Sequence, residues 1–535
     1  MMNPSTALAR AAVSALLEAG VAEVVLSPGS RNAPLSYAVY AAARAGLVRL
    51  HTRVDERSAA FLALGLTRVG SRAAVMCTSG TAVANLHPAV LEAAHSGVPL
   101  VVVTGDRPHR LDGTSANQTT DQVGIFGPLV ETADLADPEE LIGPRAEEMA
   151  AATGPTHWNL RFDEPLVPED TWEPATPAPV ESAERGRPQF LEQLPLGPRT
   201  VVVAGDDAGP PARVLAEQAG WPLFAEPTSG SRTGTHAVRT YRLLLGDESG
   251  LAAEIERVVV MGHPTLSRPV SRLLERTDVE VLAAPGTGVW SDRPFRVDRV
   301  LPGPPEVGGP DDPAWLERWR DADRSVGRQL DQLLAQEPVM TPYDVAGAVS
   351  RAVPPQGLLV VGASNPIRDL DLMVARYRVG DRRKVIANRG LAGIDGVVST
   401  AVGAALGRPR TSRALALLGD VTFLHDINGL LLGPEEARPD LTLVVVNDDG
   451  GSIFATLEQG AEDLAGPFER LFGTPHGADL ASLCAATRTP HWRLDNLAEL
   501  EHALANPAGG LEVIEAVVGR ADRRTLDARI RALRP

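Results

Sequence analysis

Lysine is almost absent from this chain of 535 residues. Of its 51 basic residues only Lys384 is a lysine, and the rest are arginines. A Walker-type phosphate loop needs the order Gly-Lys-Ser/Thr, but Lys384 stands between Arg383 and Val385. An enzyme that forms a Schiff base would also have to use Lys384. The composition therefore argues against both kinds of site.

Cysteines and long apolar runs are scarce as well. The only cysteines are Cys77 and Cys484, so no disulfide framework is expected and a reducing cytoplasm fits. No apolar run approaches the ~20 residues that cross a bilayer. Residues 1–20 lack a charged start followed by an apolar block, so no signal peptide is predicted. We therefore expect a cytoplasmic protein without integral membrane association.

Positive charge is in deficit. The formal net charge of −17 argues against binding to nucleic acid or to anionic membranes in general, although it does not exclude a local basic pocket. No Gly-x-Ser-x-Gly motif supports a hydrolase, and the histidines and cysteines do not have the spacing of metal ligands. The length predicts several domains.

Two Pro-rich stretches divide the chain, at about residues 163–198 and 302–312. They predict three domains, at residues 1–180, 190–310 and 335–535. In each domain, apolar runs typical of buried strands end at Gly, Ser, Asp or Thr and alternate with helical patterns. Such runs are Val21–Leu26, Ala73–Cys77, Leu100–Thr104, Thr200–Ala204, Arg257–Met261 and Leu358–Val361. The predicted fold class is α/β, with three doubly wound domains built on parallel sheets.

The segments Gly419-Asp420-Val421 and Asn447-Asp448-Asp449-Gly450 each follow an apolar run. With a helix-like segment at 426–432 between them, they predict a strand, a crossover and a parallel strand. Asp420 and Asn447 would then lie side by side at the carboxyl ends of neighbouring strands, where α/β sheets bind ligands. Their oxygens and a loop carbonyl suit Mg²⁺ with a diphosphate. The alternative is that both residues merely form loops, which Asp and Asn favour.

A group of charged residues, Arg53 to Arg57, comes just before an apolar helix at 59–67. For Asp55 we favour a role at the helix N-terminus, where acidic side chains are stabilised. Glu56 is interpreted differently, because a diphosphate cofactor with a basic ring needs a carboxylate partner in a separate domain. This combination indicates thiamine diphosphate.

The sequence resembles the thiamine-diphosphate enzymes over nearly its whole length, with the pyrimidine domain first and the diphosphate domain last. Among them it is most similar to the 2-succinyl-5-enolpyruvyl-6-hydroxy-3-cyclohexene-1-carboxylate synthases of menaquinone biosynthesis. The motifs that carry this resemblance are Ser27-Pro-Gly-Ser-Arg31, Asp55-Glu-Arg-Ser58, Thr78-Ser-Gly-Thr81, Asp106-Arg-Pro108, Asn117-Gln118, Asn388-Arg-Gly390, Gly393-Ile-Asp-Gly396, Gly419-Asp420 and Phe423-Leu-His-Asp426.

The resemblance implies roles toward the cofactor. Glu56 would hydrogen-bond the aminopyrimidine ring and favour the tautomer that takes a proton, and Ile394 would wedge the cofactor into a bent shape, although a plain core role for Ile394 is equally compatible with the sequence. Asp420, Asn447 and the carbonyl of Asp449 would bind Mg²⁺ or Mn²⁺, with Asp449 standing where many relatives have Gly or Asn. The remaining residues implied to bind the cofactor are Gly419, Val421, Ile453 and Phe454.

The resemblance also implies two dicarboxylate substrates, 2-oxoglutarate and isochorismate, which forked arginine donors suit. Ser364, Arg368 and Arg389 match positions near the succinyl carboxylate. Around isochorismate, the matching residues are Ser30, Arg31, Arg107 and Gln118, with Gln118 also implied in catalysis. Arg268 matches a further contact, but Ser267 stands where some relatives have Lys.

The implied reaction is decarboxylation of 2-oxoglutarate and addition of the succinyl carbanion to isochorismate, with release of CO2. The implied assembly is a homodimer or homotetramer with active sites between chains. Two alternatives remain open. One is another thiamine-diphosphate enzyme, such as a 2-oxo acid decarboxylase or an acetolactate-type synthase. The other is a non-catalytic regulator that binds a nucleotide or diphosphate on the same fold.

Overall fold

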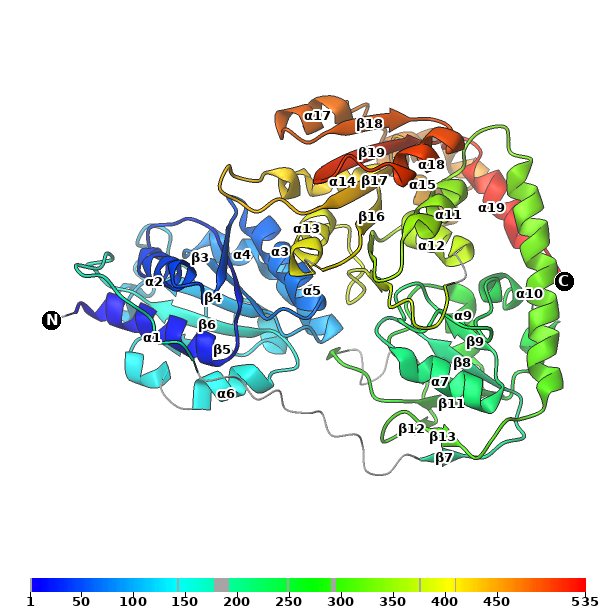
Figure 1. Cartoon of the computed structure of the whole chain (residues 1–535), viewed down its shortest axis with the longest axis horizontal. Coiled ribbons are helices and arrows are strands. Elements are labelled where there is room, and N and C mark those ends of the chain that lie inside the picture. Colours follow the sequence, from blue (N-terminus) through cyan, green and yellow to red (C-terminus); the bar gives the residue numbers. More distant parts are fainter. Residues whose placement is uncertain are drawn as a thin grey trace. The chain divides into compact units, whose positions relative to one another are not determined.

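Three large parallel sheets form the framework of the chain (Figure 1). The structure is a computed structural model that describes residues 2–141, 144–177, 192–247, 250–289, 295–374, 377–408 and 410–535. Two compact units are present. The first comprises Met1–Arg185, Gly390–Arg410 and His425–Pro439, and the second comprises Gly186–Arg389, Thr411–Leu424 and Asp440–Pro535. The predicted α/β fold class with parallel sheets is confirmed.

The sheet of the first unit has six parallel strands in the order β2-β1-β3-β4-β6-β5. Their bounds are β1 Glu23–Leu26, β2 Arg49–Thr52, β3 Ala73–Cys77, β4 Val101–Asp106, β5 Thr132–Leu135 and β6 Thr156–Arg161. The predicted strand at 73–77 is confirmed residue for residue. The helices of this sequence region are α1 Pro4–Glu18, α2 Ala33–Arg44, α3 Glu56–Arg68, α4 Thr81–Asn85, α5 His87–Ser96 and α6 Pro144–Ala151.

Alternate side chains of these strands face opposite sides of the sheet, as the two-residue period of a strand requires. Val24, Met76 and Val103 pack in one apolar cluster with buried residues of α1 and α2. Val25 and Val75 are also fully buried but lie outside that cluster, and α3 contacts both β1 and β3. Helices thus cover the sheet on both faces, and the loops at the carboxyl ends of the strands remain for function.

Helix α3 packs closely against α13 (Val397–Gly407), although the two helices are far apart in sequence. Glycines make this approach possible. A Cβ on Gly65 would lie 2.2 Å from the carbonyl oxygen of Thr400, and one on Gly403 would lie 2.1 Å from that of Leu62. Neither glycine can be replaced without moving the partner backbone, so the two helix backbones are in direct contact.

The second unit contains two large parallel sheets. The first has the order β12-β11-β10-β8-β9 and comprises β8 Thr200–Ala204, β9 Leu223–Ala225, β10 Arg257–Met261, β11 Glu280–Ala283 and β12 Arg299–Val300. A separate pair joins β7 Gln193–Leu194 to β13 Glu306–Val307. The helices of this region are α7 Pro210–Ala219, α8 Tyr241–Leu244, α9 Arg268–Glu275 and α10 Pro313–Ala335.

The other sheet has the order β15-β14-β16-β17-β19-β18. Its strands are β14 Leu358–Val361, β15 Lys384–Ile386, β16 Ala414–Gly419, β17 Leu441–Asn447, β18 His491–Leu494 and β19 Leu511–Val517. The helices of this region are α11 Pro342–Ala352, α12 Asn365–Met373, α14 Asp420–His425, α15 Ser452–Ala455, α16 Ala465–Phe468, α17 Leu480–Ala486, α18 Leu497–Ala505 and α19 Arg523–Arg531.

The connection between β16 and β17 differs from the prediction. The helix begins at Asp420 itself and ends at His425, and a short 3-10 turn follows at Ile427–Leu430. No regular helix spans 426–432 because Asp426 is buried and its carboxylate accepts hydrogen bonds from Ser58 and Ser399. The predicted parallel pairing of β16 with β17 is nevertheless confirmed.

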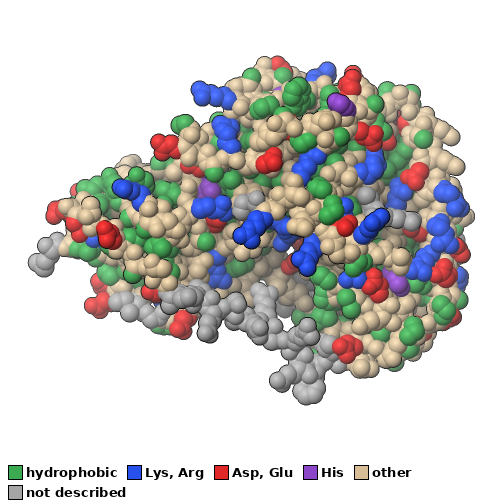
Figure 2. Space-filling view, viewed as in Figure 1, with side chains coloured by type: hydrophobic (Ala, Val, Ile, Leu, Met, Phe, Trp, Pro, Cys, Tyr) green, Lys and Arg blue, Asp and Glu red, His purple; other side chains and the backbone are tan. Residues whose placement is uncertain are grey.

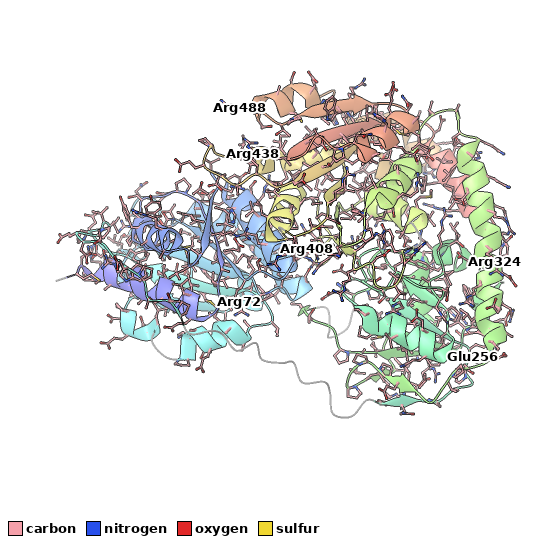
Figure 3. The ribbon with its side chains drawn as sticks, in the orientation of Figure 1. Arg72, Glu256, Arg324, Arg408, Arg438 and Arg488 are labelled. Carbon is pink, nitrogen blue, oxygen red and sulfur yellow. The ribbon has the colours of Figure 1, made fainter. Side chains whose placement is uncertain are left out.

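Many arginines act as structural ties rather than as ligands. Arg72, labelled in Figure 3, donates to the carbonyl oxygens of Ala19, Met149 and Ala150 at 2.7–3.1 Å. Glu256, also labelled there, accepts from Arg199 at 2.9 Å. On the face drawn in Figure 2, acidic and basic side chains are interspersed. The presence of an arginine is therefore no evidence of substrate binding in this chain unless the residue lies at a candidate site.

Part of the predicted organisation lies beyond what the structure describes. The first Pro-rich stretch includes residues 178–191, which are outside the described residues, and the three domain boundaries stay a prediction. Among the described residues, no helix is both long enough and apolar enough to cross a membrane.

Replacing Gly65 or Gly403 by Ala is expected to lower the free energy of unfolding by about 1–3 kcal/mol, because the added methyl group overpacks the α3–α13 contact. Thermal or urea unfolding of each variant measures the change. The matched control is Gly154→Ala, since a Cβ there meets nothing within 4 Å. Equal stability of all three variants would contradict the proposed role of the glycines.

Candidate active site

Asp420 and Asn447 lie at the carboxyl ends of adjacent parallel strands, as predicted, with β16 in register beside β17. One loop contacts both side chains. The amide of Gly450 donates to Oδ2 of Asp420 at 2.9 Å, and the amide of Asp449 donates to Oδ1 of Asn447 at 3.0 Å. Successive peptide groups thus hold a carboxylate and an amide oxygen close together.

Further contacts fix the orientation of this pair. Nδ2 of Asn447 donates to Glu515 at 2.7 Å, which leaves its oxygen directed toward the loop. Nε2 of His476 lies 3.1 Å from Oδ2 of Asp420. Nδ1 of His476 accepts from the amide of Ala478 at 3.0 Å, so the proton of a neutral ring is on Nε2 and the ring donates to Asp420.

The side chain of Asp449 holds a neighbouring turn, a role that was not predicted from the sequence. Its backbone has a positive φ of 58°, and Oδ1 accepts from the amides of His476 and Gly477 at 3.0 and 2.8 Å. These backbone hydrogen bonds lower the pKa of the Asp449 carboxyl. The carboxylate therefore anchors the turn that carries His476. The carbonyl oxygen, the expected metal ligand, accepts from Arg520 at 2.9 Å.

The donor set fits a hard cation. It offers carboxylate, amide and carbonyl oxygens. Beside it, burial and then the nearby charge of Asp420 raise the pKa of Asp448 to about 7. In the described part of the chain, no cluster of three His, Cys, Asp or Glu side chains has the arrangement of a metal site; the expected set has only one such side chain, Asp420. The neighbouring helix α15 carries Ile453 and Phe454.

Glu56 is the first residue of α3 in the other unit. Asp55 caps this helix by accepting from the amides of Arg57 and Ser58, which confirms its predicted role. Glu56 is half-buried and accepts from Asn85 at 3.3 Å. Burial, followed by the charge of Glu56, raises the pKa of the Cys77 thiol, so Glu56 lies close to the end of β3.

Ile394 is half-buried in the segment that leads into α13. Two residues later Gly396 has a φ of +60° and stands directly against the ring of Phe61 in α3; a Cβ at this position would lie 1.9 Å from that ring. The segment that carries Ile394 is therefore tied to the helix that begins with Glu56. Glu92 of α5 strengthens the tie, since its buried carboxylate accepts from the amides of Gly390 and Leu391, each at 2.7 Å.

The residues predicted to contact isochorismate gather at the carboxyl ends of β1 and β4. Arg107 directly follows β4, is buried, and donates to the carbonyl oxygen of Gln118 at 2.7 Å. Burial and the nearby charge of Arg31 lower the pKa of Arg107, so the two guanidinium groups are neighbours. Ser30 and the side chain of Gln118 are exposed beside them. Arg31 is held by the carbonyl of Phe162 at 3.0 Å.

The residues predicted near the succinyl carboxylate also gather, in the second unit. A cavity of about 480 Å³ is lined by Arg268, Arg368, Ile453 and other residues. Burial lowers the pKa of Arg368, and the charges of Arg389, Arg242 and Arg268 lower it further. Nη1 of Arg368 donates at 2.6 Å to the carbonyl of Ser364, the residue that precedes α12. Arg268 is mostly exposed and pairs with Glu458 at 3.0 Å.

Three residues that contact these groups were not predicted from the sequence motifs. His476 and Arg520 contact the Asp420 loop, and Arg242 donates to the carbonyl of Arg368 at 3.0 Å. Each comes from a segment far along the chain, so spacing gives no signal for it. The only local sign is the sequence Pro475-His476-Gly477, which is typical of a turn.

The chain is similar in sequence to known proteins. Residues 6–125 match the family described as thiamine pyrophosphate enzyme, N-terminal TPP binding domain. The chain is 68% identical to the 2-succinyl-5-enolpyruvyl-6-hydroxy-3-cyclohexene-1-carboxylate synthase of Nocardioides sp. strain JS614, over 99% of this chain and 98% of that protein. It is 47% identical to the synthase of the same name from Kineococcus radiotolerans, over 97% of each chain. The synthase of Saccharopolyspora erythraea is 44% identical over 99% of each chain.

Replacing Asp449 by Ala is expected to release the turn at 476–477, because two backbone amides lose their acceptor. Hydrogen–deuterium exchange of the protein without cofactor should show faster exchange of these amides, by about 10-fold for the loss of a net ~1.4 kcal/mol. Asp449→Asn keeps an acceptor oxygen and is expected to show a smaller change. Unaltered exchange in Asp449→Ala would show that the carboxylate does not anchor the turn.

Proposed function

The chain belongs to the family of 2-succinyl-5-enolpyruvyl-6-hydroxy-3-cyclohexene-1-carboxylate synthases, and from this membership we propose its reaction and site. The protein decarboxylates 2-oxoglutarate and adds the succinyl unit to isochorismate, with release of CO2 and retention of the enolpyruvyl group. It acts in menaquinone biosynthesis as a thiamine-diphosphate-dependent transferase.

The observation that carries this proposal is the presence of two separate arginine groups, one for each dicarboxylate. Arg31 and Arg107 form the first group, which serves isochorismate. Arg368 and Arg389 form the second, which serves 2-oxoglutarate, with Arg268 on the same cavity as Arg368. Arg389 is 2% exposed, and its Nε has no hydrogen-bond partner among the described residues. A buried donor without a partner is costly, so an incoming carboxylate would stabilise it.

Asp420, Asn447 and the carbonyl of Asp449 would hold a divalent cation, Mg²⁺ or Mn²⁺, and through it the diphosphate. Asp420 is 2% exposed and already oriented by Gly450 and His476, which supports a preformed site. The carbonyl of Asp449 has a second lone pair beside the one used by Arg520. Gly419, Val421, Ile453 and Phe454 complete the proposed cofactor contacts.

When bound, thiamine diphosphate supplies a carbon nucleophile and an electron sink for decarboxylation. The chain supplies the proton chemistry and the orientation. Glu56 would hydrogen-bond the ring nitrogen of the bound cofactor and so favour the form that accepts a proton. Ile394 would pack against the bound cofactor, and its segment contacts α3 through Gly396 and Phe61.

Each substrate is oriented by charge and by hydrogen bonds. Arg368 and Arg389 bind the distal carboxylate of 2-oxoglutarate, assisted by Ser364, because forked guanidinium donors match a carboxylate. Isochorismate is oriented in the same way. Arg31 and Arg107 bind its carboxylates, while Ser30 and Gln118 contact its ring. Gln118 has a positive φ of 57°, a costly conformation that is typical of functional loops.

Assembly and location are part of the proposal. Glu56 of one chain works with Asp420 of a second chain in a homodimer or homotetramer, as the family resemblance implies. Both cysteines are free and buried, which supports a reducing compartment such as the cytoplasm. The three-domain division at 1–180, 190–310 and 335–535 remains part of this proposal.

Turnover of isochorismate tests the function directly. The protein mixed with thiamine diphosphate, Mg²⁺, 2-oxoglutarate and isochorismate is expected to consume isochorismate. Glu56→Gln should lose nearly all of this activity, by about 100-fold or more, because a proton-transfer group contributes 10²–10⁴-fold, while cofactor binding by calorimetry is largely retained. Glu131→Gln, an exposed change in the same unit, is the control.

Two results would contradict the proposal. Consumption of pyruvate in place of 2-oxoglutarate would indicate an acetolactate-type synthase or another 2-oxo acid decarboxylase. Cofactor binding without any turnover by the unmodified protein would favour a diphosphate-binding regulator. Full activity of Glu56→Gln would leave the reaction intact but overturn the role of Glu56.

The two arginine groups are expected to separate in steady-state kinetics. Arg368→Gln should raise the KM for 2-oxoglutarate by about 10- to 100-fold, the value of a charged hydrogen bond, and change the KM for isochorismate little. Arg31→Gln should do the reverse. Measuring both KM values for both variants checks the assignment, and an equal rise of the two KM values in each variant would refute it.

A further inference from the structure

Glu226 is a buried carboxylate that the proposed reaction does not use. It directly follows β9 and is 2% exposed. Its Oε1 accepts from two successive backbone amides, those of Thr265 and Leu266, at 3.0 and 2.9 Å. Burial raises its pKa to about 8, and the nearby charge of Arg389 opposes this rise. Because both of these hydrogen bonds go to one loop, the function of this buried acid depends on what the loop carries.

The loop held by Glu226 connects β10 to α9 and contacts the proposed 2-oxoglutarate site at two places. Oγ1 of Thr265 accepts from Nη2 of Arg389 at 2.7 Å. Leu266 and Arg268 line the cavity that Arg368 also lines. A displacement of this short loop would therefore move a hydrogen-bond partner of one arginine and the wall of the cavity together.

The contact with Thr265 has a particular value for Arg389. An arginine has several rotatable bonds, and its guanidinium becomes an effective receptor only when its direction is fixed. Among the described residues Arg389 forms no ion pair, and its Nε has no hydrogen-bond partner. The hydroxyl thus fixes the direction of the guanidinium through a hydrogen bond, while the nearby charge of Glu226 stabilises its positive charge.

We propose that Glu226 is a positioning residue for the 2-oxoglutarate carboxylate: it anchors the Thr265–Leu266 peptide, and Thr265 in turn orients Arg389. The inference rests on the proposed function, since Arg389 must bind this substrate. It adds Glu226 and Thr265, which follow strands β9 and β10, to a site that already includes Arg368 and Arg389. The hydrogen-bond acceptor of Glu226 carries the effect, and a side chain that keeps this acceptor should preserve it.

A pair of Thr265 variants tests the second link. Thr265→Val is nearly isosteric but lacks the hydroxyl, and it is expected to raise the KM for 2-oxoglutarate by about 10-fold, the effect of one net hydrogen bond to a charged group. The KM for isochorismate, kcat and the affinity for thiamine diphosphate should change less than about 2-fold on the same reasoning, because Arg389 is the hydrogen-bond partner of the Thr265 hydroxyl in the described part of the chain. Thr265→Ser keeps the hydroxyl and should recover most of the affinity.

A pair of Glu226 variants tests the first link. Glu226→Gln keeps an oxygen that accepts both amides and is expected to retain most of the 2-oxoglutarate affinity. Glu226→Leu removes the acceptor and should raise the same KM at least as much as Thr265→Val does. Glu280→Gln, an exposed change on the same sheet, controls for effects of charge removal. If Glu226→Leu does not fold, the Thr265 pair still decides the inference.

The experiment distinguishes a failure of this positioning role from a failure of the proposed function. Absence of turnover by the unmodified protein overturns both. Normal turnover with equal KM values for 2-oxoglutarate in Thr265→Val and Thr265→Ser overturns the positioning role alone. A fall in melting temperature without a selective rise in that KM would mean that Glu226 and Thr265 only stabilise the fold.

Discussion

The parallel pairing of β16 with β17 is the constraint on which the rest of the candidate site depends. Two adjacent strands that run in one direction deliver their carboxyl ends to the same edge of the sheet, and here these ends are Asp420 and Asn447. The loop after β17 then reaches back to both side chains with successive amides. Glu515, His476 and Arg520 add their contacts to a geometry that the pairing has already established.

Arginine serves two purposes in this chain, and the partners of each guanidinium distinguish them. Arg523 and Arg232 are buried against the carboxylates of Asp369 and Asp371. Such pairs neutralise the charge. Removing one partner would leave an uncompensated buried charge and so lower the stability of the fold. Arg107 and Arg389 contact carbonyl or hydroxyl oxygens instead. These uncharged acceptors hold the two guanidinium groups in place, which suits recognition of a dicarboxylate.

Much of the fold could be predicted from the sequence because buried parallel strands are continuous apolar runs. β3, β8 and β10 begin and end where those runs do. β2 and β18 were not predicted, since both are short edge strands with mostly exposed or half-buried side chains. The segment after Asp420 was predicted wrongly, because burial of the Asp426 carboxylate, a tertiary effect, decides its conformation.

The same division applies to the site. Asp420, Asn447 and the helix-capping role of Asp55 could be predicted, since strand ends and helix starts are local features. His476 and Arg520 could not be predicted in their observed positions, nor could Glu226. Each of these side chains acts through a contact with a distant segment. Glu226 and His476 accept hydrogen bonds from backbone amides, which every residue except proline has, so the sequence gives no sign of these contacts.

The close contact between α3 and α13 links two parts of the chain that are far apart in sequence, so an exchange of one half of the chain would separate them. The helix that begins with Glu56 and the helix that follows Ile394 meet through Gly65 and Gly403, with no room for a larger side chain at either position. A chimaera that joined the first half of this chain to the second half of a relative would bring together helices that have not been selected for one another. Such an exchange would succeed only where the relative also has a small residue at the position of Gly403.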